Sequence, residues 1–419
     1  MRYLFVTDEF FPEFGANSII IASISKQLVQ MGNEVYVLPF NYNTCNDRFE
    51  KWGNIHIYRI INRDDRQTLI KMLKSCKYLA AYRILYNYIV YKFTGNKNLY
   101  SNNRIVAELQ LEEFIKSNKI DVSISICCSY ELSLPFFYLK QNNKLHCKWI
   151  FYMLDPFATH SFYLKYYNEN KLKKLQHKLM KTADAVIMTD LIKAELVKWE
   201  SKEILKKSYA LGFPKIINHK IVHAQDDIKL NDDYFNIVYV GACNVNVRNP
   251  YWTLEFCKYL KGTNIKLHIV GSEWREFVQN IDQYNGNLIL HGALSHQACI
   301  NAELNADALL NIGNSISNQM PSKILEYIST GKPIINFYKL ENCPSHDYLR
   351  KYPIVLNIKE FQYPLKSTVN NVKKFINDNR GKKVEFDYIE KTYYENTVLH
   401  ITSKIIQISK EITQNAGHN

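Results

Sequence analysis

Hydrophobic and polar positions alternate along this chain in a repeated order: a short apolar run, a polar loop, then a longer segment with apolar residues three or four positions apart. The short runs are typical of buried β-strands and the longer segments of amphipathic helices. In the first half, this pattern predicts strands at residues 3–7, 34–38, 55–61, 121–127, 148–153 and 185–188. In the second half, it predicts strands at 235–240, 266–270, 288–291, 308–312 and 334–338. Strands that alternate with helices form parallel sheets, so the pattern predicts two doubly wound α/β domains.

A break in the pattern separates the two halves. Residues 214–233 are polar and charged without periodicity, which predicts a linker. We therefore expect an N-terminal Rossmann-like domain over residues 1–213 and a C-terminal one over 234–387. An apolar helical pattern at 388–412 predicts one last helix within 388–419.

Composition supports a globular protein and limits its chemistry. The 419 residues are 47% hydrophobic and 22% charged, and no apolar run reaches the roughly 20 residues that a membrane-spanning helix needs. The nine cysteines are scattered, with no Cys-x-x-Cys pair, which favours reduced thiols in a cytoplasmic protein. No Asp-x-Asp motif occurs either, so we expect no metal site and no resident cofactor.

The net charge of +13 is concentrated in one region. Ten basic residues lie from Arg59 to Arg104, against two acidic ones, and the segment between Arg66 and Lys97 is also rich in tyrosine at helical spacing. Such a segment suits a helix on an anionic membrane surface. The alternative is a core-packing helix with a solvated basic face. We expect no nucleic-acid partner, because the basic residues do not form a recognised binding module.

Polar residues of the first domain follow its predicted strands. Gly15 lies in the loop after the first strand, which lacks the G-x-G-x-x-G of a dinucleotide site, and an ordinary turn explains it equally well. Asp155 and His160 follow the strand at 148–153, and ligands of open α/β sheets gather at that end. Asp155 is alternatively a turn residue before Pro156.

In the second domain, the loops after the first two strands carry candidate ligand-binding residues. Gly241 lets backbone approach a ligand, and Arg248 offers a forked donor to phosphate oxygens. Gly271 and Ser272 either line the same pocket or form a tight turn.

Residues 318–335 predict a loop, a short helix and a strand. Ser322 is a candidate helix cap, and Gly331 predicts the helix end. Lys323 and Glu326 are three residues apart, so they share one side of the helix at its N-terminal end. A cation, a carboxylate and free helix amides suit the phosphate and ribose of a nucleotide sugar. The alternative is an exposed i,i+3 ion pair of a few tenths of a kcal/mol.

The run Pro-Ser-Lys-Ile-Leu-Glu-Tyr-Ile-Ser-Thr-Gly-Lys-Pro-Ile-Ile at 321–335 resembles the nucleotide-sugar signature of family-4 (group 1) glycosyltransferases with the GT-B fold, in the bacterial surface-polysaccharide branch. The resemblance implies two Rossmann-like domains that face a cleft, with the last helix returning to the first domain. It places Gly15 and Asp155 at the cleft. It assigns Glu326 to the ribose hydroxyls, and Arg248 and Lys323 to the diphosphate, with Ser322 beside them.

The chain departs from the family at Asn318. There the broad family carries a glutamate that contacts the transferred sugar, and asparagine can hydrogen-bond a hydroxyl but carries no charge. A retaining mechanism therefore rests on overall resemblance.

The resemblance implies a metal-independent glycosyltransferase. It moves a sugar from a nucleotide-sugar donor, a UDP-sugar in the first instance, to a lipid-linked or polysaccharide acceptor, on the inner face of the cell membrane. The alternatives are a GT-B sugar-nucleotide epimerase or hydrolase, and an inactive GT-B scaffold protein.

Overall fold

The computed structural model describes residues 1–7, 10–11, 16–39, 49–59, 103–127, 132–164, 167–317, 319 and 321–414. The chain forms two compact units. Unit 1 comprises Met1–Gly212 and Ile401–Asn419, and unit 2 comprises Phe213–His400. Gly15, Asn318 and the segment between Arg66 and Lys97 lie outside the described residues, so the predictions on them stay predictions.

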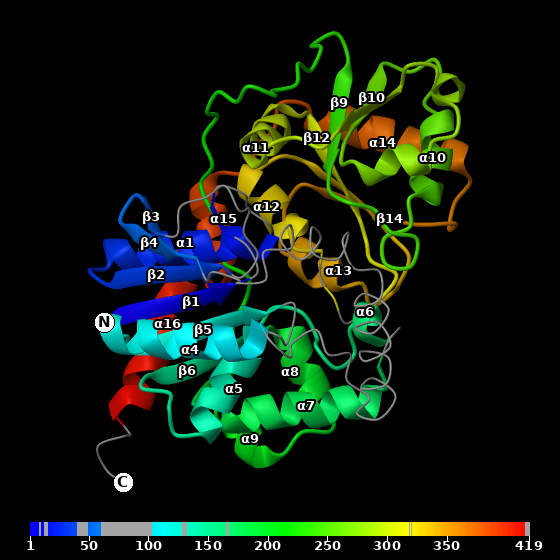
Figure 1. The fold of residues 1–419 in the computed structure, drawn as a ribbon. Helices are drawn as coiled ribbons and strands as arrows, with labels where there is room; N and C mark the ends of the chain where they lie inside the picture. The colour runs from blue at the N-terminus through cyan, green and yellow to red at the C-terminus, as the bar shows by residue number, and fades with distance from the viewer. Residues whose placement is uncertain are drawn as a thin grey trace, which may run out of the picture. The chain divides into compact units, whose positions relative to one another are not determined.

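Unit 1 is built on an eight-stranded sheet in the order β3-β4-β2-β1-β5-β6-β7-β8 (Figure 1). All neighbouring strands run parallel except β3 and β4. The strands are β1 (Arg2–Thr7), β2 (Glu34–Pro39), β3 (Phe49–Trp52), β4 (Ile55–Tyr58), β5 (Val122–Cys127), β6 (Lys148–Met153), β7 (Ala185–Met188) and β8 (Ser208–Ala210).

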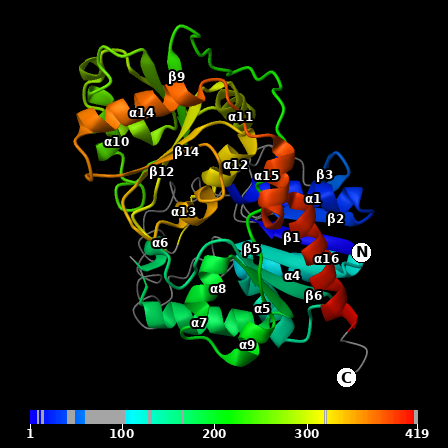
Figure 2. The same cartoon turned by 180° about the vertical axis from the view of Figure 1, so that it is seen from behind.

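Helices cover both faces of this sheet, as doubly wound topology requires. Figure 2 shows the last helix, α16, beside α1. Helix α5 packs against both α4 and α7. The helices are α1 (Ala16–Gln30), α4 (Asn103–Asn118), α5 (Leu134–Gln141), α6 (Ser161–Leu164), α7 (Glu169–Thr182), α8 (Asp190–Leu196), α9 (Lys202–Lys206) and α16 (Val398–Gln414).

Unit 2 is built on a six-stranded, fully parallel sheet in the order β11-β10-β9-β12-β13-β14. The central strand β9 is buried along its whole length, and five of its six residues are apolar. The strands are β9 (Phe235–Val240), β10 (Ile265–Val270), β11 (Leu288–Gly292), β12 (Ala308–Ile312), β13 (Ile334–Tyr338) and β14 (Val355–Lys359).

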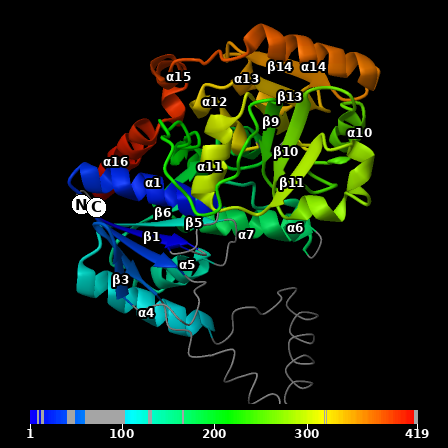
Figure 3. The same ribbon diagram turned by 90° about the horizontal axis from the view of Figure 1, so that it is seen from above.

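Two helix layers enclose the sheet of unit 2. Figure 3 shows α11 and α12 on one face and α10 and α14 on the other. The elements are α10 (Tyr251–Lys258), η2 (Glu273–Glu276), η3 (Ile281–Tyr284), α11 (His296–Asn305), α12 (Lys323–Thr330), α13 (Pro344–Leu349), α14 (Leu365–Asn379), α15 (Phe386–Thr392) and η4 (Tyr394–Asn396).

Aromatic side chains fill the core on the α10 face. Trp252 meets Phe337 edge to face at 4.8 Å between ring centroids, and Phe256 meets Phe337 at 5.1 Å. Burying one such side chain is worth about 1.5–3 kcal/mol. This core fixes β13, and with it the position of the helix α12 that precedes it.

The predicted alternation of strands and helices is confirmed, but the sequence pattern does not predict three strands at the ends of the sheets. β3, β8 and β14 are short, and their side chains are partly exposed, so they lack the continuous apolar run of the central strands. β14 pairs in parallel with β13 and completes the sheet of unit 2.

The prediction of one helix over 388–412 is wrong. The segment divides into α15, η4 and α16, with Thr397 between them in an extended conformation. Thr397 makes a parallel bridge with Ile216. Its Oγ1 accepts a hydrogen bond from the backbone amide of His400, in the first turn of α16. This pairing with a segment distant in sequence overrides the local helical pattern.

Candidate functional site

The candidate site lies at the carboxyl edge of the unit 2 sheet, at the point where the strand order reverses. β9 pairs with β10 on one side and with β12 on the other, so the chain leaves β9 and β12 toward opposite sides of the sheet. Ligands of open α/β sheets bind outside such a switch point. The loop at 241–250 and residues 313–317 leave the sheet here.

Two glycines let neighbouring strand ends approach each other closely. Gly241 and Gly271 follow β9 and β10, with φ of +149° and +156°. A Cβ on Gly271 would overlap the carbonyl oxygen of Gly241. That oxygen also accepts a hydrogen bond from Trp274 Nε1 at 3.2 Å. Close packing therefore requires Gly271, while the adjacent Ser272 is exposed and caps no helix through its side chain.

Arg248 connects the two loops at the switch point. Its Nε and Nη2 donate to Asn314 Oδ1 at 3.3 and 3.2 Å, and its Nη1 lies 3.4 Å from the Tyr239 hydroxyl. Asn314 is buried and donates to the carbonyl of Gln319 at 2.8 Å. The guanidinium is half-buried and held in one orientation at the sheet edge, which suits bidentate recognition of phosphate.

Tyr327 holds helix α12 against the end of β9. Its buried hydroxyl accepts from the amide of Val240 at 2.8 Å and donates to the Val240 carbonyl at 3.2 Å. At the other end of the helix, Gly331 takes the left-handed conformation with φ of +75°, which confirms the predicted C-cap. The predicted cap at Ser322 is wrong: its backbone is already helical, and its side chain makes no capping bond.

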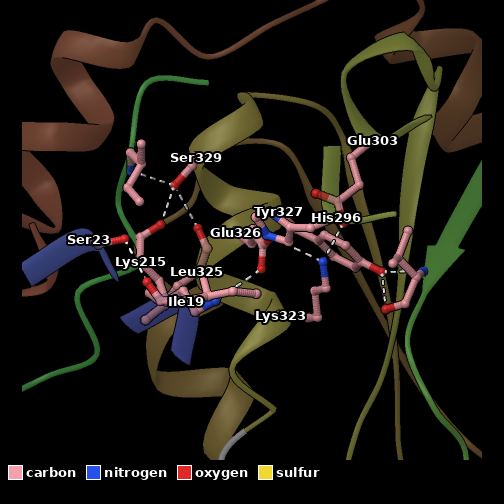
Figure 4. A network of polar contacts seen from close by, with 12 residues as sticks. Ile19, Ser23, Lys215, His296, Glu303, Lys323, Leu325, Glu326, Tyr327 and Ser329 are labelled. Carbon is pink, nitrogen blue, oxygen red and sulfur yellow. Dashed lines mark hydrogen bonds and ion pairs between the residues drawn. The ribbon is translucent and has the colours of Figure 1, made fainter. Parts of the chain in front are cut away.

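Lys323 and Glu326 belong to a buried ionic cluster rather than an exposed pair (Figure 4). Lys323 Nζ lies 3.1 Å from Glu326 Oε1 and 3.0 Å from Glu303 Oε1, on α11. Lys215 Nζ lies 3.5 Å from Glu326 Oε2, and His296 Nε2 lies 3.3 Å from Glu326 Oε1. The two carboxylates are 1% (Glu303) and 3% (Glu326) exposed, so the surface-pair alternative is wrong.

The pKa values of the two carboxyl groups are shifted in opposite directions. Burial alone would raise the pKa of Glu326, but the charges of Lys323 and Lys215 hold that pKa well below its usual range. Glu303 has fewer positive neighbours, and burial raises its pKa to about 7. Burial lowers the pKa of the nearby His219 to about 4, so this imidazole is neutral. At neutral pH, the cluster thus contains one firmly ionised carboxylate and one that is close to its titration point.

Sequence reasoning missed three members of this cluster: Glu303, Lys215 and His296. They come from α11 and from the segment that opens unit 2, and nothing in the local sequence signals that they meet Glu326. The segment is fixed to α12 by Ser329, whose Oγ donates to the Lys215 carbonyl at 3.0 Å.

Two further predicted site residues lie in unit 1. Asp155 and His160 follow β6, and both are half-buried. The His160 ring contacts the Tyr163 ring at 5.8 Å, and Thr159 donates to Glu195 at 3.1 Å. They stand at the carboxyl end of their strand, as the sequence predicts.

Among the residues that the structure describes, no group of three or more His, Cys, Asp or Glu side chains could hold a metal ion. Within the same part of the chain, none of the helices has the length and apolar character needed to cross a bilayer.

Several solved structures are similar to nearly the whole chain, whereas sequence comparisons find no match. No protein-family profile matches the chain, and no curated protein matches it by sequence. Among similar solved structures, TarM has a TM-score of 0.63 at 12% identity, covering 98% of each chain. Sucrose-phosphate synthase from Thermosynechococcus elongatus has a TM-score of 0.60 at 12% identity, covering 99% of this chain and 97% of that one. WaaG, a glycosyltransferase involved in lipopolysaccharide biosynthesis, has a TM-score of 0.54 at 11% identity, covering 100% of both chains. The chain therefore has the GT-B fold, with two parallel-sheet α/β domains.

Proposed function

We propose that this protein is a glycosyltransferase that transfers a sugar from a nucleotide-sugar donor to a lipid-linked or polysaccharide acceptor. The observation that carries the proposal is the position of Arg248, Lys323 and Glu326 at the switch point of unit 2, within a GT-B fold. Sugar transfer requires that the protein bind the diphosphate and the nucleoside of the donor and align the acceptor hydroxyl with the anomeric carbon.

Each of these requirements has a candidate group. Arg248 and Lys323 neutralise the diphosphate and its leaving charge without a metal ion, and Ser322 and the first amides of α12 add hydrogen bonds. Glu326, kept ionised by its cationic neighbours, accepts hydrogen bonds from the ribose. The loop that contains Asn314 and Asn318 takes the sugar.

The named neighbours favour a UDP-sugar donor and a surface-glycan acceptor. One similar structure is described as bound with UDP-2-fluoro glucose, and another concerns enzymatic glycosyl transfer with retention. WaaG and the galactosyltransferase WaaB are described with lipopolysaccharide. On this basis we propose retention at the anomeric carbon. From their place after β6, we propose Asp155 and His160 as catalytic residues of unit 1.

Localisation forms part of the proposal. The enzyme acts in the cytoplasm at the inner face of the cell membrane, which the basic segment between Arg66 and Lys97 contacts. This proposal rests on the charge and tyrosine pattern of that segment.

A donor-turnover assay tests the function. The protein is incubated with a panel of UDP- and GDP-sugars, with and without a bacterial lipid extract, and released nucleoside diphosphate and glycosylated lipid are measured by mass spectrometry. We expect release that depends on the extract for at least one donor. Equal release without acceptor would indicate a hydrolase or epimerase, and no release with any donor would favour the inactive scaffold.

A further inference from the structure

The proposed function gives Glu326 and Lys323 roles in donor binding, but it gives no role to Glu303, the second carboxylate of the ionic cluster. It comes from α11, outside the 321–335 run, and its Oε1 lies 3.0 Å from Lys323 Nζ. Its Oε2 is buried and has no hydrogen-bond partner among the residues that the structure describes. An ionised carboxylate with one unpartnered buried oxygen is costly, whereas a protonated one costs far less.

The charges of the cluster balance only while the donor is absent. When both carboxylates are ionised, Glu303 and Glu326 carry two negative charges, and Lys323 and Lys215 carry two positive charges. A bound diphosphate would bring further negative charge to Lys323, which Glu303 already contacts. Additional negative charge nearby favours protonation of a carboxylate, and most strongly of the one with fewer positive neighbours, here Glu303.

We propose that Glu303 is a positioning residue that takes up a proton from solvent when a nucleoside diphosphate binds, and so releases Lys323 toward the phosphate. This inference rests on the proposed function of the same site. The proton binds Glu303 Oε2, the oxygen without a partner, while Lys323 keeps all three protons and its positive charge. Glu326 stays ionised and continues to hold the lysine from its own helix.

The surroundings of Glu303 favour this assignment over its neighbours. Burial already raises its pKa to about 7, so little further change is needed to protonate it near neutral pH. The titratable and charged groups that face it are Lys323, Glu326 and Tyr327 of α12, Lys215 of the opening segment, and Cys299 of its own helix. Of these groups, only the two lysines are cationic, and both also form ion pairs with Glu326. Glu303 therefore has no cationic neighbour of its own among the groups named here.

Calorimetric titration with UDP tests the inference, and GDP replaces UDP if UDP does not bind. The titration is run at pH 7.5 in two buffers with different ionisation enthalpies, so that the dependence of the heat on buffer gives the number of protons taken up. A carboxyl with a pKa near 7 is about one-quarter protonated at this pH, so full protonation adds about three-quarters of a proton per site. Glu303→Gln, which copies the protonated form, should bind with that uptake missing, and its affinity should no longer fall as pH rises above 7.

Glu341→Gln is the matched control, since Glu341 is an exposed carboxylate of the same unit, paired with Lys359. It should keep the proton uptake of the wild type. Proton release by the ligand itself is common to all three proteins and cancels in the difference. Equal uptake by wild type and Glu303→Gln would overturn the inference, as would a folded Glu303→Gln protein that no longer binds. If the wild type binds neither UDP nor GDP, the proposed function fails and the inference with it.

Discussion

Replacing Glu303 by glutamine should stabilise the folded protein at high pH, although it removes an ion pair. Glutamine keeps the shape of the side chain and removes the charge, and Lys323 retains Glu326 at 3.1 Å. The expected gain comes from the buried carboxylate, whose ionised form is unfavourable here even beside a lysine. Removal of a buried ion pair member usually destabilises, so the sign of the effect is the informative result.

The magnitude follows from proton linkage. The pKa of Glu303 is about 7 in the folded protein, against a reference of 4.5. This rise in pKa corresponds to a free energy on the order of 3 kcal/mol, because a tenfold change in proton affinity is worth about 1.4 kcal/mol. Because the folded pKa is the raised one, this stability is fully present below the unfolded pKa and is lost as pH rises through about 7. The wild type therefore lacks it at pH 8, and Glu303→Gln keeps it.

Differential scanning calorimetry at pH 8 and pH 5 provides the measurement. For a unit of this size, 1 kcal/mol shifts Tm by about 2–4 °C, so Glu303→Gln should melt up to roughly 6–12 °C higher than the wild type at pH 8. At pH 5 the folded carboxyl is already protonated, and the difference should fall below about 1 kcal/mol. A Glu303→Gln protein that melts lower than the wild type at pH 8, by the same amount as at pH 5, would refute the reasoning.

Two further predictions concern the anchoring of α12 and the basic segment. Tyr327→Phe leaves the buried amide and carbonyl of Val240 without their partner, so we expect a loss of about 1–3 kcal/mol of stability and weaker UDP binding, with every charge of the cluster retained; unchanged UDP affinity in calorimetry would show that α12 needs no such anchor. The segment between Arg66 and Lys97 should carry the protein into the lipid fraction of a flotation gradient with anionic vesicles, and less so at high salt. Absence from the lipid fraction at low salt would count against membrane contact.

The sequence predicts the interior of each sheet better than its margins. β9 is apolar at five of its six positions, and the stop at Gly331 depends on a single residue's freedom to adopt positive φ. Such signals are local, so they can be read without the fold. β14 and the extended Thr397 depend on partners distant in sequence, β13 and Ile216, and the local pattern does not contain them.

The candidate site divides in the same way. Lys323 and Glu326 are three residues apart on one helix, so their proximity follows from helical geometry. Glu303 joins them from 20 residues away, and Lys215 from more than 100 residues away, because α11 and the opening segment of unit 2 pack against α12. Tertiary packing also determines that the pair is buried, which changes its expected strength and its titration.

The central claim is that unit 2 binds a nucleoside diphosphate through Arg248 and Glu326. Calorimetric titration of UDP and GDP into the wild type, Arg248→Ala and Glu326→Gln tests it most directly, with Arg350→Ala as the control because Arg350 is an exposed arginine of the same unit. We predict saturable binding of one nucleotide to the wild type and to Arg350→Ala. For each folded site variant, we predict a loss of about 1–3 kcal/mol, roughly 5- to 150-fold in affinity. No binding to the wild type, or equal binding to all four proteins, would contradict the claim.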